Sequence, residues 1–208
     1  MKLVDDTLAR FADVLASDAP APGGGSVAAL NGALAAALLR MVCALTAGKE
    51  KYREFQGEAL ETARLAGELQ ARLLAGVDED TEAFGKVSAV FSMPKGTDEE
   101  KAARGAAMQS ALKGAALAPL ETVKAARDCA RLAASALGKT NASCASDLGS
   151  AALCALASAR AAWLNVKINL SGIKDAEFGE RVGREAREAL AEAERLSDEV
   201  YAKTERAV

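Results

Sequence analysis

The sequence predicts an all-α fold: a single domain over residues 1–208, built as a compact bundle of five to seven helices. Alanine and leucine dominate the chain, aromatic residues make up only 4% of it, and it has no alternating runs of β-branched residues. Half of the 208 residues are hydrophobic, which is enough for one sizeable core and too little for two.

The chain is expected to begin with a short amphipathic helix near residues 4–17, which the loop at 20–25 ends. A helix at about 26–46 follows. It is rich in alanine and glycine and carries one charge, Arg40, so we expect it to be buried on all sides. A membrane span is rejected, because Asn31 and Arg40 interrupt the apolar stretch.

Two long, charged, amphipathic helices are expected at about 52–93 and 98–137, and Pro119 should kink or divide the second of them. A second helix of low charge, also expected to be buried, covers about 142–170. From Asp175 onward, apolar residues recur every three to four positions between Glu and Arg, which predicts an amphipathic helix for packing or pairing.

Composition argues against several classes of function. The net charge is −3, from 26 basic and 29 acidic residues, without the basic excess that nucleic-acid binding requires. No apolar run follows the first residues and the four cysteines have no CxxC spacing, so we expect no signal peptide, reduced thiols and a cytoplasmic location. The absence of histidine rules out Ser-His-Asp triads and most zinc sites, which leaves proton transfer to carboxylates, lysine, tyrosine or thiol.

Asp80 occupies the centre of an apolar seam. Apolar residues at 69, 73, 77, 84, 87 and 91 have heptad-like spacing, while Asp78 falls on the opposite, solvated face of the same expected helix. A carboxylate at a core position costs several kcal/mol unless a partner compensates it. Two interpretations are open: a helix cap or buried ion pair, or a functional acid whose raised pKa lets it exchange protons near neutrality.

The stretch Pro22-Gly-Gly-Gly-Ser26 precedes the first buried helix. Three glycines can present bare backbone amides to a flat or anionic ligand, with Ser26 as the N-cap and the helix dipole behind it. The alternative is a turn into a crowded core where no side chain fits.

A polar loop at residues 138–147 leads into the second buried helix. Its Gly-Lys-Thr imitates the end of a P-loop, but Ala133 replaces the earlier glycine and no strand precedes it, so nucleotide triphosphate binding is not expected. Asn141, Ser146 and Asp147 either cap the helix or orient a ligand at its amino end.

Asn165 and Asn169 lie one turn apart at the far end of the same helix. A continuous helix places Asp147 about 27 Å from Asn165, so the two ends cannot touch one small group. Either the helix carries two polar sites, or a dimer brings the end of one chain to the beginning of another, which is the interpretation we prefer.

Taken in order, these stretches resemble one known family. They are residues 22–29, the segment Gly48-Lys-Glu-Lys-Tyr52, Asp80 through Phe84, Met93-Pro-Lys95, Ser146-Asp147 and residues 165–175. Over residues 22–175 the chain resembles the cyclodeaminase/cyclohydrolase family of folate enzymes. The resemblance implies an all-helical cytosolic homodimer that needs no metal and no cofactor beyond its tetrahydrofolate substrate, including polyglutamylated forms.

The resemblance also implies one of two reactions. A cyclodeaminase cyclises 5-formimino-tetrahydrofolate to 5,10-methenyl-tetrahydrofolate with release of ammonia, and a cyclohydrolase converts the methenyl compound to 10-formyl-tetrahydrofolate. The loop at residues 140–147 resembles that of the deaminase domain in bifunctional formiminotransferase enzymes, which favours the deaminase, with a separate formiminotransferase as a partner. The alternative from another class is a non-catalytic helical folate-binding or assembly subunit, against which Asp80 argues.

The implied site residues follow from the matching motifs, with roles assigned on chemical grounds. Asp80 is the acid or base, and Asp147 is the second catalytic candidate. The folate pocket would be formed by Gly23, Gly24, Gly25 and Ser26, with Asn141, Asn165 and Asn169 orienting the pterin or the one-carbon group together with Asp147. The candidates for binding the glutamate tail are Lys49, Lys51, Lys95 and Lys139, for which simple solvation is the alternative.

Overall fold

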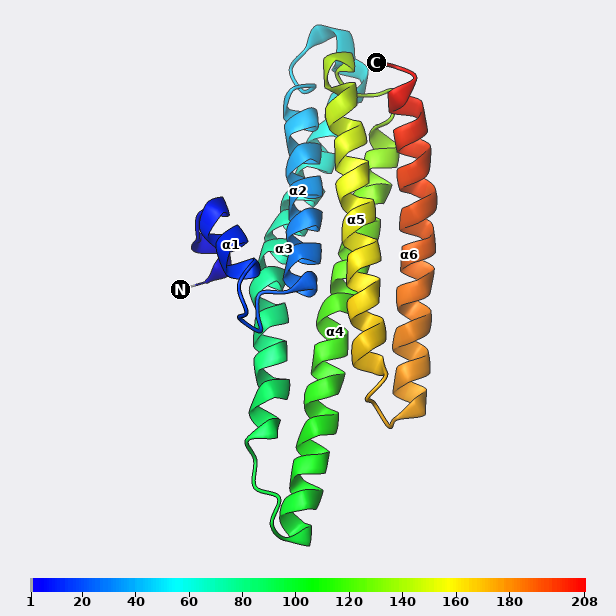
Figure 1. Ribbon diagram of the computed structural model, residues 1–208. Coiled ribbons are helices and arrows are strands. Elements are labelled where there is room, and N and C mark those ends of the chain that lie inside the picture. The colour runs from blue at the N-terminus through cyan, green and yellow to red at the C-terminus, as the bar shows by residue number, and fades with distance from the viewer. Residues whose placement is uncertain (1) are drawn as a thin grey trace.

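The computed structural model describes residues 2–208, and over these residues the protein is all-α, which confirms the predicted fold class (Figure 1). The six α-helices are α1 (Leu8–Leu15), α2 (Gly24–Ala44), α3 (Gln56–Phe91), α4 (Asp98–Ala136), α5 (Ala145–Leu170) and α6 (Ala176–Glu205). Three short 3-10 helices are η1 (Leu3–Asp5), η2 (Glu50–Phe55) and η3 (Ala142–Cys144).

Helices α2, α3, α4 and α5 pack together as a bundle, and α6 lies against α4 and α5 (Figure 1). Helix α2 begins beside the middle of α3, so α3 and α4 continue as a hairpin past its N-terminus (Figure 1). This difference in length leaves one end of α2 inside the bundle, and that end is where the candidate site lies.

The core is built largely from small residues on α2, α4 and α5. Gly32 of α2 lies so close to α3 and α5 that a Cβ there would be 2.8 Å from side-chain atoms of both Leu73 and Ser158. Both α2 and the segment from η3 through α5 have the length and hydropathy of a membrane span, but half of each apolar stretch is buried by neighbouring helices. Each of the two helices therefore keeps an exposed face, and the prediction that both would be buried on all sides is wrong.

Pro119 lies inside α4, which runs unbroken from Asp98 to Ala136, so of the two predicted effects, a kink or a division, the division does not occur. A proline has no N–H to donate to the carbonyl four residues earlier, here that of Ala115. The side-chain amide of Asn169 on α5 donates to that carbonyl instead, at 2.8 Å. A neighbouring helix thus supplies the hydrogen bond that Pro119 cannot make.

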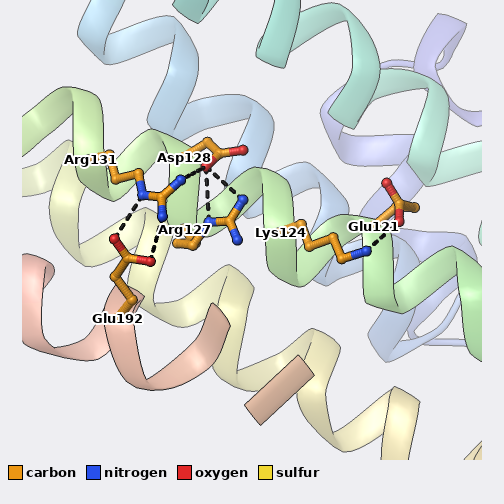
Figure 2. A network of polar contacts seen from close by, with 6 residues as sticks. All are labelled: Glu121, Lys124, Arg127, Asp128, Arg131 and Glu192. Carbon is orange, nitrogen blue, oxygen red and sulfur yellow. Dashed lines mark hydrogen bonds and ion pairs between the residues drawn. The ribbon is translucent and has the colours of Figure 1, made fainter. Parts of the chain in front are cut away.

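Ion pairs join α6 to α4 along their exposed edge (Figure 2). Arg131 of α4 donates two hydrogen bonds to Glu192 of α6, at 2.8 and 2.7 Å, and a third to Asp128 at 3.1 Å. Lys124 pairs with Glu185 of α6 at 2.8 Å. Because these side chains are partly solvated, each pair contributes about 1 kcal/mol or less, and together they orient α6 on the bundle.

The expected helix at residues 4–17 is present as η1 and α1, neither of which has a buried residue. The backbone N–H of Leu3 donates to Asp78 Oδ1 at 2.7 Å. Asp78 is therefore half-buried beneath the N-terminal segment, and the prediction that it lies on a solvated face is wrong.

Candidate active site

The N-terminus of α2 lies directly against Asp80 of α3. A Cβ built on Gly25 would lie 2.0 Å from Asp80 Oδ1 and 2.5 Å from its Cγ, distances that no side chain tolerates. Glycine at this position lets the carboxyl group rest on bare backbone. Gly23 has open space, and a Cβ on Gly24 would make an ordinary 3.6 Å contact with Asn165. Of the three glycines, only Gly25 is required to be bare by the neighbouring side chain.

Ser26 is a partner of Asp80 and not the cap of α2. The N-cap is Gly23, so the prediction that Ser26 would cap the helix is wrong. The fully buried Ser26 hydroxyl lies 3.0 Å from the carbonyl oxygen of Val77, 3.1 Å from Asp80 Oδ2 and 3.3 Å from Thr81 Oγ1. Ser26 therefore connects α2 to one turn of α3 and fixes one oxygen of the carboxyl group.

The surroundings of Asp80 favour its neutral form more than water does. Burial raises the pKa of the Asp80 carboxyl above its ordinary value, and hydrogen bonds from the Ser26 hydroxyl and backbone partly oppose the rise. The free N–H groups at the start of α2 also favour the charged form. These opposing influences suit a carboxyl group that must both take up and release a proton.

The hydrogen-bond geometry accommodates both protonation states. As a carboxylate, Asp80 accepts a hydrogen bond from Ser26 at 3.1 Å. As a neutral acid, it can donate to Ser26 Oγ while the Ser26 hydroxyl donates to the Val77 carbonyl at 3.0 Å. No ion-pair partner for Asp80 occurs within the described part of the chain, and Asp80 lies well inside α3. The cap and ion-pair interpretations therefore do not apply.

The two asparagines at the C-terminal end of α5 lie near this end of α2. Asn165 lies against Gly24, and its side-chain amide donates to the Ala161 carbonyl of its own helix at 2.9 Å. Asn169 is held to the carbonyl of Ala115, as described above. The structure thus brings Asn165 to the glycine segment, and the amide nitrogens of both asparagines have structural partners.

The other predicted polar residues lie at the opposite end of α2, about 30 Å away by helix length. The Asn141 amide donates to the Leu45 carbonyl at 3.3 Å and its oxygen accepts from the Ser143 N–H, so Asn141 caps η3. Tyr52 accepts a hydrogen bond from the Ala142 N–H at 3.0 Å, and this bond lowers the tyrosine pKa. The loop that resembles a P-loop is therefore held by structural hydrogen bonds.

The lysines and Asp147 do not meet Asp80 within one chain. Lys139 pairs with Glu58, and the Lys51 ammonium lies 5.4 Å from the centre of the Tyr52 ring. Lys49 is exposed nearby, and Lys95 is exposed in the loop between α3 and α4. Asp147 lies in the first turn of α5, at the end remote from Asn165. The predicted roles of these residues remain predictions, and they require a second chain or a separate subsite.

The remote end also contains a cavity of about 600 Å³, which Lys51, Asn141 and Lys203 help to line. It lies between the start of α5 and the end of α6, with the apolar side chains of Leu137 and Leu148 in its wall. The sequence predicted polar residues at this end but not a cavity. Part of its wall, including Lys203, comes from α6, which is distant in sequence from Lys51 and Asn141.

Sequence reasoning missed one polar neighbour of Asp80. Thr81 adds a second hydroxyl beside Ser26, at 3.3 Å. Its position next to Asp80 in the sequence could have indicated this role. Among residues 2–208, no three cysteine, aspartate or glutamate side chains lie close enough to hold a metal ion.

The chain is similar to the proteins of one known family. The family model described as formiminotransferase-cyclodeaminase matches residues 7–188, nearly the whole chain. The chain belongs to the formiminotransferase-cyclodeaminase family. Membership confirms the resemblance drawn from the glycine segment, Asp80 and the asparagine segment.

Individual relatives of the family differ in their named activity. A methenyltetrahydrofolate cyclohydrolase from Methylorubrum extorquens is 42% identical over 197 residues, covering 95% of both chains. The formimidoyltransferase-cyclodeaminase of Mus musculus is 32% identical over 92% of this chain, which corresponds to 35% of the mouse protein. The crystal structure of a formiminotetrahydrofolate cyclodeaminase from Thermotoga maritima superposes with a TM-score of 0.88, at 30% identity and 98% coverage of each chain.

Proposed function

We propose that the chain catalyses a one-carbon reaction on tetrahydrofolate, with Asp80 as the proton-transferring residue. The observation that carries the proposal is the seating of the Asp80 carboxyl on the bare backbone of Gly25, next to the Ser26 hydroxyl and with a raised pKa. Family membership supports the class of substrate. The reaction needs neither a histidine nor a metal ion, which suits the composition of the chain.

Hydrolysis of 5,10-methenyl-tetrahydrofolate is the reaction that the 42% identical relative favours. The Asp80 carboxylate accepts a proton from water as the water oxygen bonds to the methenyl carbon. The resulting neutral acid then donates that proton to N5 as the carbon–N5 bond breaks, and the remaining hydroxyl proton passes to solvent. The product is 10-formyl-tetrahydrofolate, and Asp80 returns to its carboxylate form.

Cyclodeamination is the second candidate, which the structural relative from Thermotoga maritima favours. Here N10 attacks the formimino carbon, and the N10 proton passes to the formimino nitrogen, which becomes an amino group. Neutral Asp80 protonates the departing nitrogen as the carbon–nitrogen bond breaks, which releases ammonia. In cyclodeamination Asp80 must begin as a neutral acid, whereas in hydrolysis it begins as a carboxylate base.

Paired turnover assays separate the two reactions. One assay follows formation of the methenyl absorbance from 5-formimino-tetrahydrofolate together with ammonia release, and the other follows its decay from 5,10-methenyl-tetrahydrofolate. The decisive variant is Asp80→Asn, and the matched control is Asp78→Asn, whose carboxyl binds the Leu3 N–H instead. We expect the first variant to lose at least about a hundredfold in kcat, which is the range for loss of a general acid or base. If neither reaction of the native protein exceeds its spontaneous rate, the chain is a folate-binding or assembly subunit.

The protein is further proposed to act as a homodimer. Exposed apolar side chains line the outer sides of the adjacent helices α2 and α5: Leu34, Met41, Leu45, Leu153, Leu164 and Ile168. A second copy placed antiparallel on these helices would bury them and bring the partner's lysine-rich end near Asp80. Light scattering after size exclusion should give twice the chain mass of 21.4 kDa, and Leu34→Glu should reduce it to the monomer.

The lysines at the remote end of α2 are the proposed contacts for a polyglutamate tail, reached across that dimer. Double replacement of Lys49 and Lys51 by alanine should raise KM for polyglutamylated substrates and leave KM for the monoglutamate unchanged. A separate formiminotransferase would supply the formimino substrate in the deaminase case. The four free thiols support the proposed cytoplasmic location.

A further inference from the structure

The apolar seam of α3 does not end where α2 ends. Leu73 and Val77, which lie beneath α2, are each 1% exposed. Past Asp80, the same seam continues with Phe84 and Phe91, which are 44% and 65% exposed. Helix α2 covers the seam only as far as Asp80, because it begins at Gly24 and α3 runs about 16 Å further to Phe91. A partly exposed aromatic side chain, Phe84, therefore lies directly beyond the candidate acid.

The position of Phe84 relative to Asp80 is fixed by the helix. The two residues are one turn apart on the same face of α3, which places their Cβ atoms about 5 to 6 Å apart. The carboxyl group of Asp80 is held by Ser26 and rests on Gly25. A flat ring lying on Phe84 would thus have its edge at the Asp80 carboxyl and the bare backbone of Gly24 and Gly25 next to it.

We propose that Phe84 positions the substrate by stacking against its pteridine ring, so that the one-carbon bridge beside that ring meets Asp80. This inference rests on the proposed folate chemistry. A pteridine is a planar, conjugated bicycle, and such rings stack on exposed aromatic side chains as nucleic-acid bases do. Phe84 is a positioning residue, since it has no group that can transfer a proton.

The test compares Phe84→Ala with Phe91→Ala, a matched loss of an exposed phenylalanine from the same seam. For Phe84→Ala we expect KM for 5,10-methenyl-tetrahydrofolate to rise about tenfold to hundredfold, the range seen when stacked aromatics are removed, with a smaller change in kcat. Phe84→Trp should restore KM to within about threefold of the native value. Phe91→Ala should change KM less than about threefold, because Phe91 lies about 16 Å along the helix from Asp80.

Equal KM values for Phe84→Ala and the native protein would overturn the inference. So would equal rises in Phe84→Ala and Phe91→Ala, since these would indicate a general apolar surface. Light scattering on each variant measures its oligomeric state. If Phe84→Ala dissociates a dimer that Phe91→Ala preserves, Phe84 is an interface residue and the inference is wrong.

A direct binding measurement tests this inference separately from the proposed reaction. Calorimetric titration with 5-formyl-tetrahydrofolate, which has the pteridine but no methenyl bridge, measures Kd without turnover. If the native protein turns over neither substrate yet Phe84→Ala weakens this binding about tenfold or more, the stacking holds and the proposed reaction fails. If the native protein shows turnover and Phe84→Ala changes neither Kd nor KM, the proposed reaction is supported and the proposed stacking is wrong.

Discussion

Replacement of Gly25 by alanine tests whether the seating of Asp80 on bare backbone matters for activity. The new Cβ would begin 2.0 Å from Asp80 Oδ1, 2.5 Å from Cγ and 2.7 Å from Oδ2. Gly25 is a helical residue without a positive φ, so alanine itself suits the backbone and favours the helix by up to about 1 kcal/mol. The closest collision that the substitution introduces is with Asp80.

The size of the effect follows from these distances. An ordinary carbon–oxygen contact is about 3.4 Å, so the carboxyl group must move by more than about 1 Å. Displacement breaks its hydrogen bond with Ser26, and a bond to a charged group contributes about 1.5 to 3 kcal/mol. After the alanine gain is subtracted, we expect a loss of about 1 to 2 kcal/mol in stability. Misplacing a catalytic group by about 1 Å costs on the order of a hundredfold in kcat.

Turnover of 5,10-methenyl-tetrahydrofolate and thermal unfolding would be measured in parallel on Gly25→Ala and Gly24→Ala. Gly24→Ala is the matched control, because its Cβ would make only an ordinary 3.6 Å contact with Asn165. The control should keep kcat within about threefold of the native value and unfold at the native temperature or slightly above it. Native turnover in Gly25→Ala would refute the claim that Asp80 acts from this seat.

Two further predictions concern stability. Because folding raises the pKa of Asp80, the free-energy cost of ionising the buried carboxyl is absent below the ordinary aspartate pKa, and stability is lost as pH rises from that value through the folded pKa. The stability gained by Asp80→Asn should therefore increase from pH 4 to pH 8 in urea unfolding, and a gain independent of pH would contradict the raised pKa. Asn169→Ala should cost about 1 to 3 kcal/mol, since it leaves the buried carbonyl of Ala115 without a donor. Adding Pro119→Ala to that variant restores a backbone N–H and should recover most of the loss, and failure to recover would show that Asn169 acts otherwise.

Periodicity and composition were sufficient to predict the helical elements. The apolar seam of α3 places Asp80 on the packing face because heptad-like spacing depends only on helix geometry. The Ala- and Gly-rich segments become α2 and α5 because small residues allow close helix packing. The observed ends of α2 and α5 differ from the expected ones by at most three residues. Family motifs added the class of substrate, which helix geometry does not contain.

Contacts between distant segments could not be predicted. Ser26 has the sequence context of an N-cap, yet α2 begins at Gly24 with Gly23 as its N-cap, so the serine lies in the first turn, where it contacts Asp80. Pro119 is tolerated only because Asn169, far along the chain, reaches its free carbonyl. The sequence also did not show that, of the three glycines, Gly25 is the one in close contact with the Asp80 side chain, since this contact depends on where α2 meets α3.

The role of Asp80 is tested by the turnover of 5,10-methenyl-tetrahydrofolate and 5-formimino-tetrahydrofolate by the native protein and by Asp80→Asn. We expect the native protein to accelerate at least one of these reactions and Asp80→Asn, although folded, to lose at least about a hundredfold in kcat. Retention of native kcat by a folded Asp80→Asn would contradict the assignment of Asp80 as the proton-transferring residue.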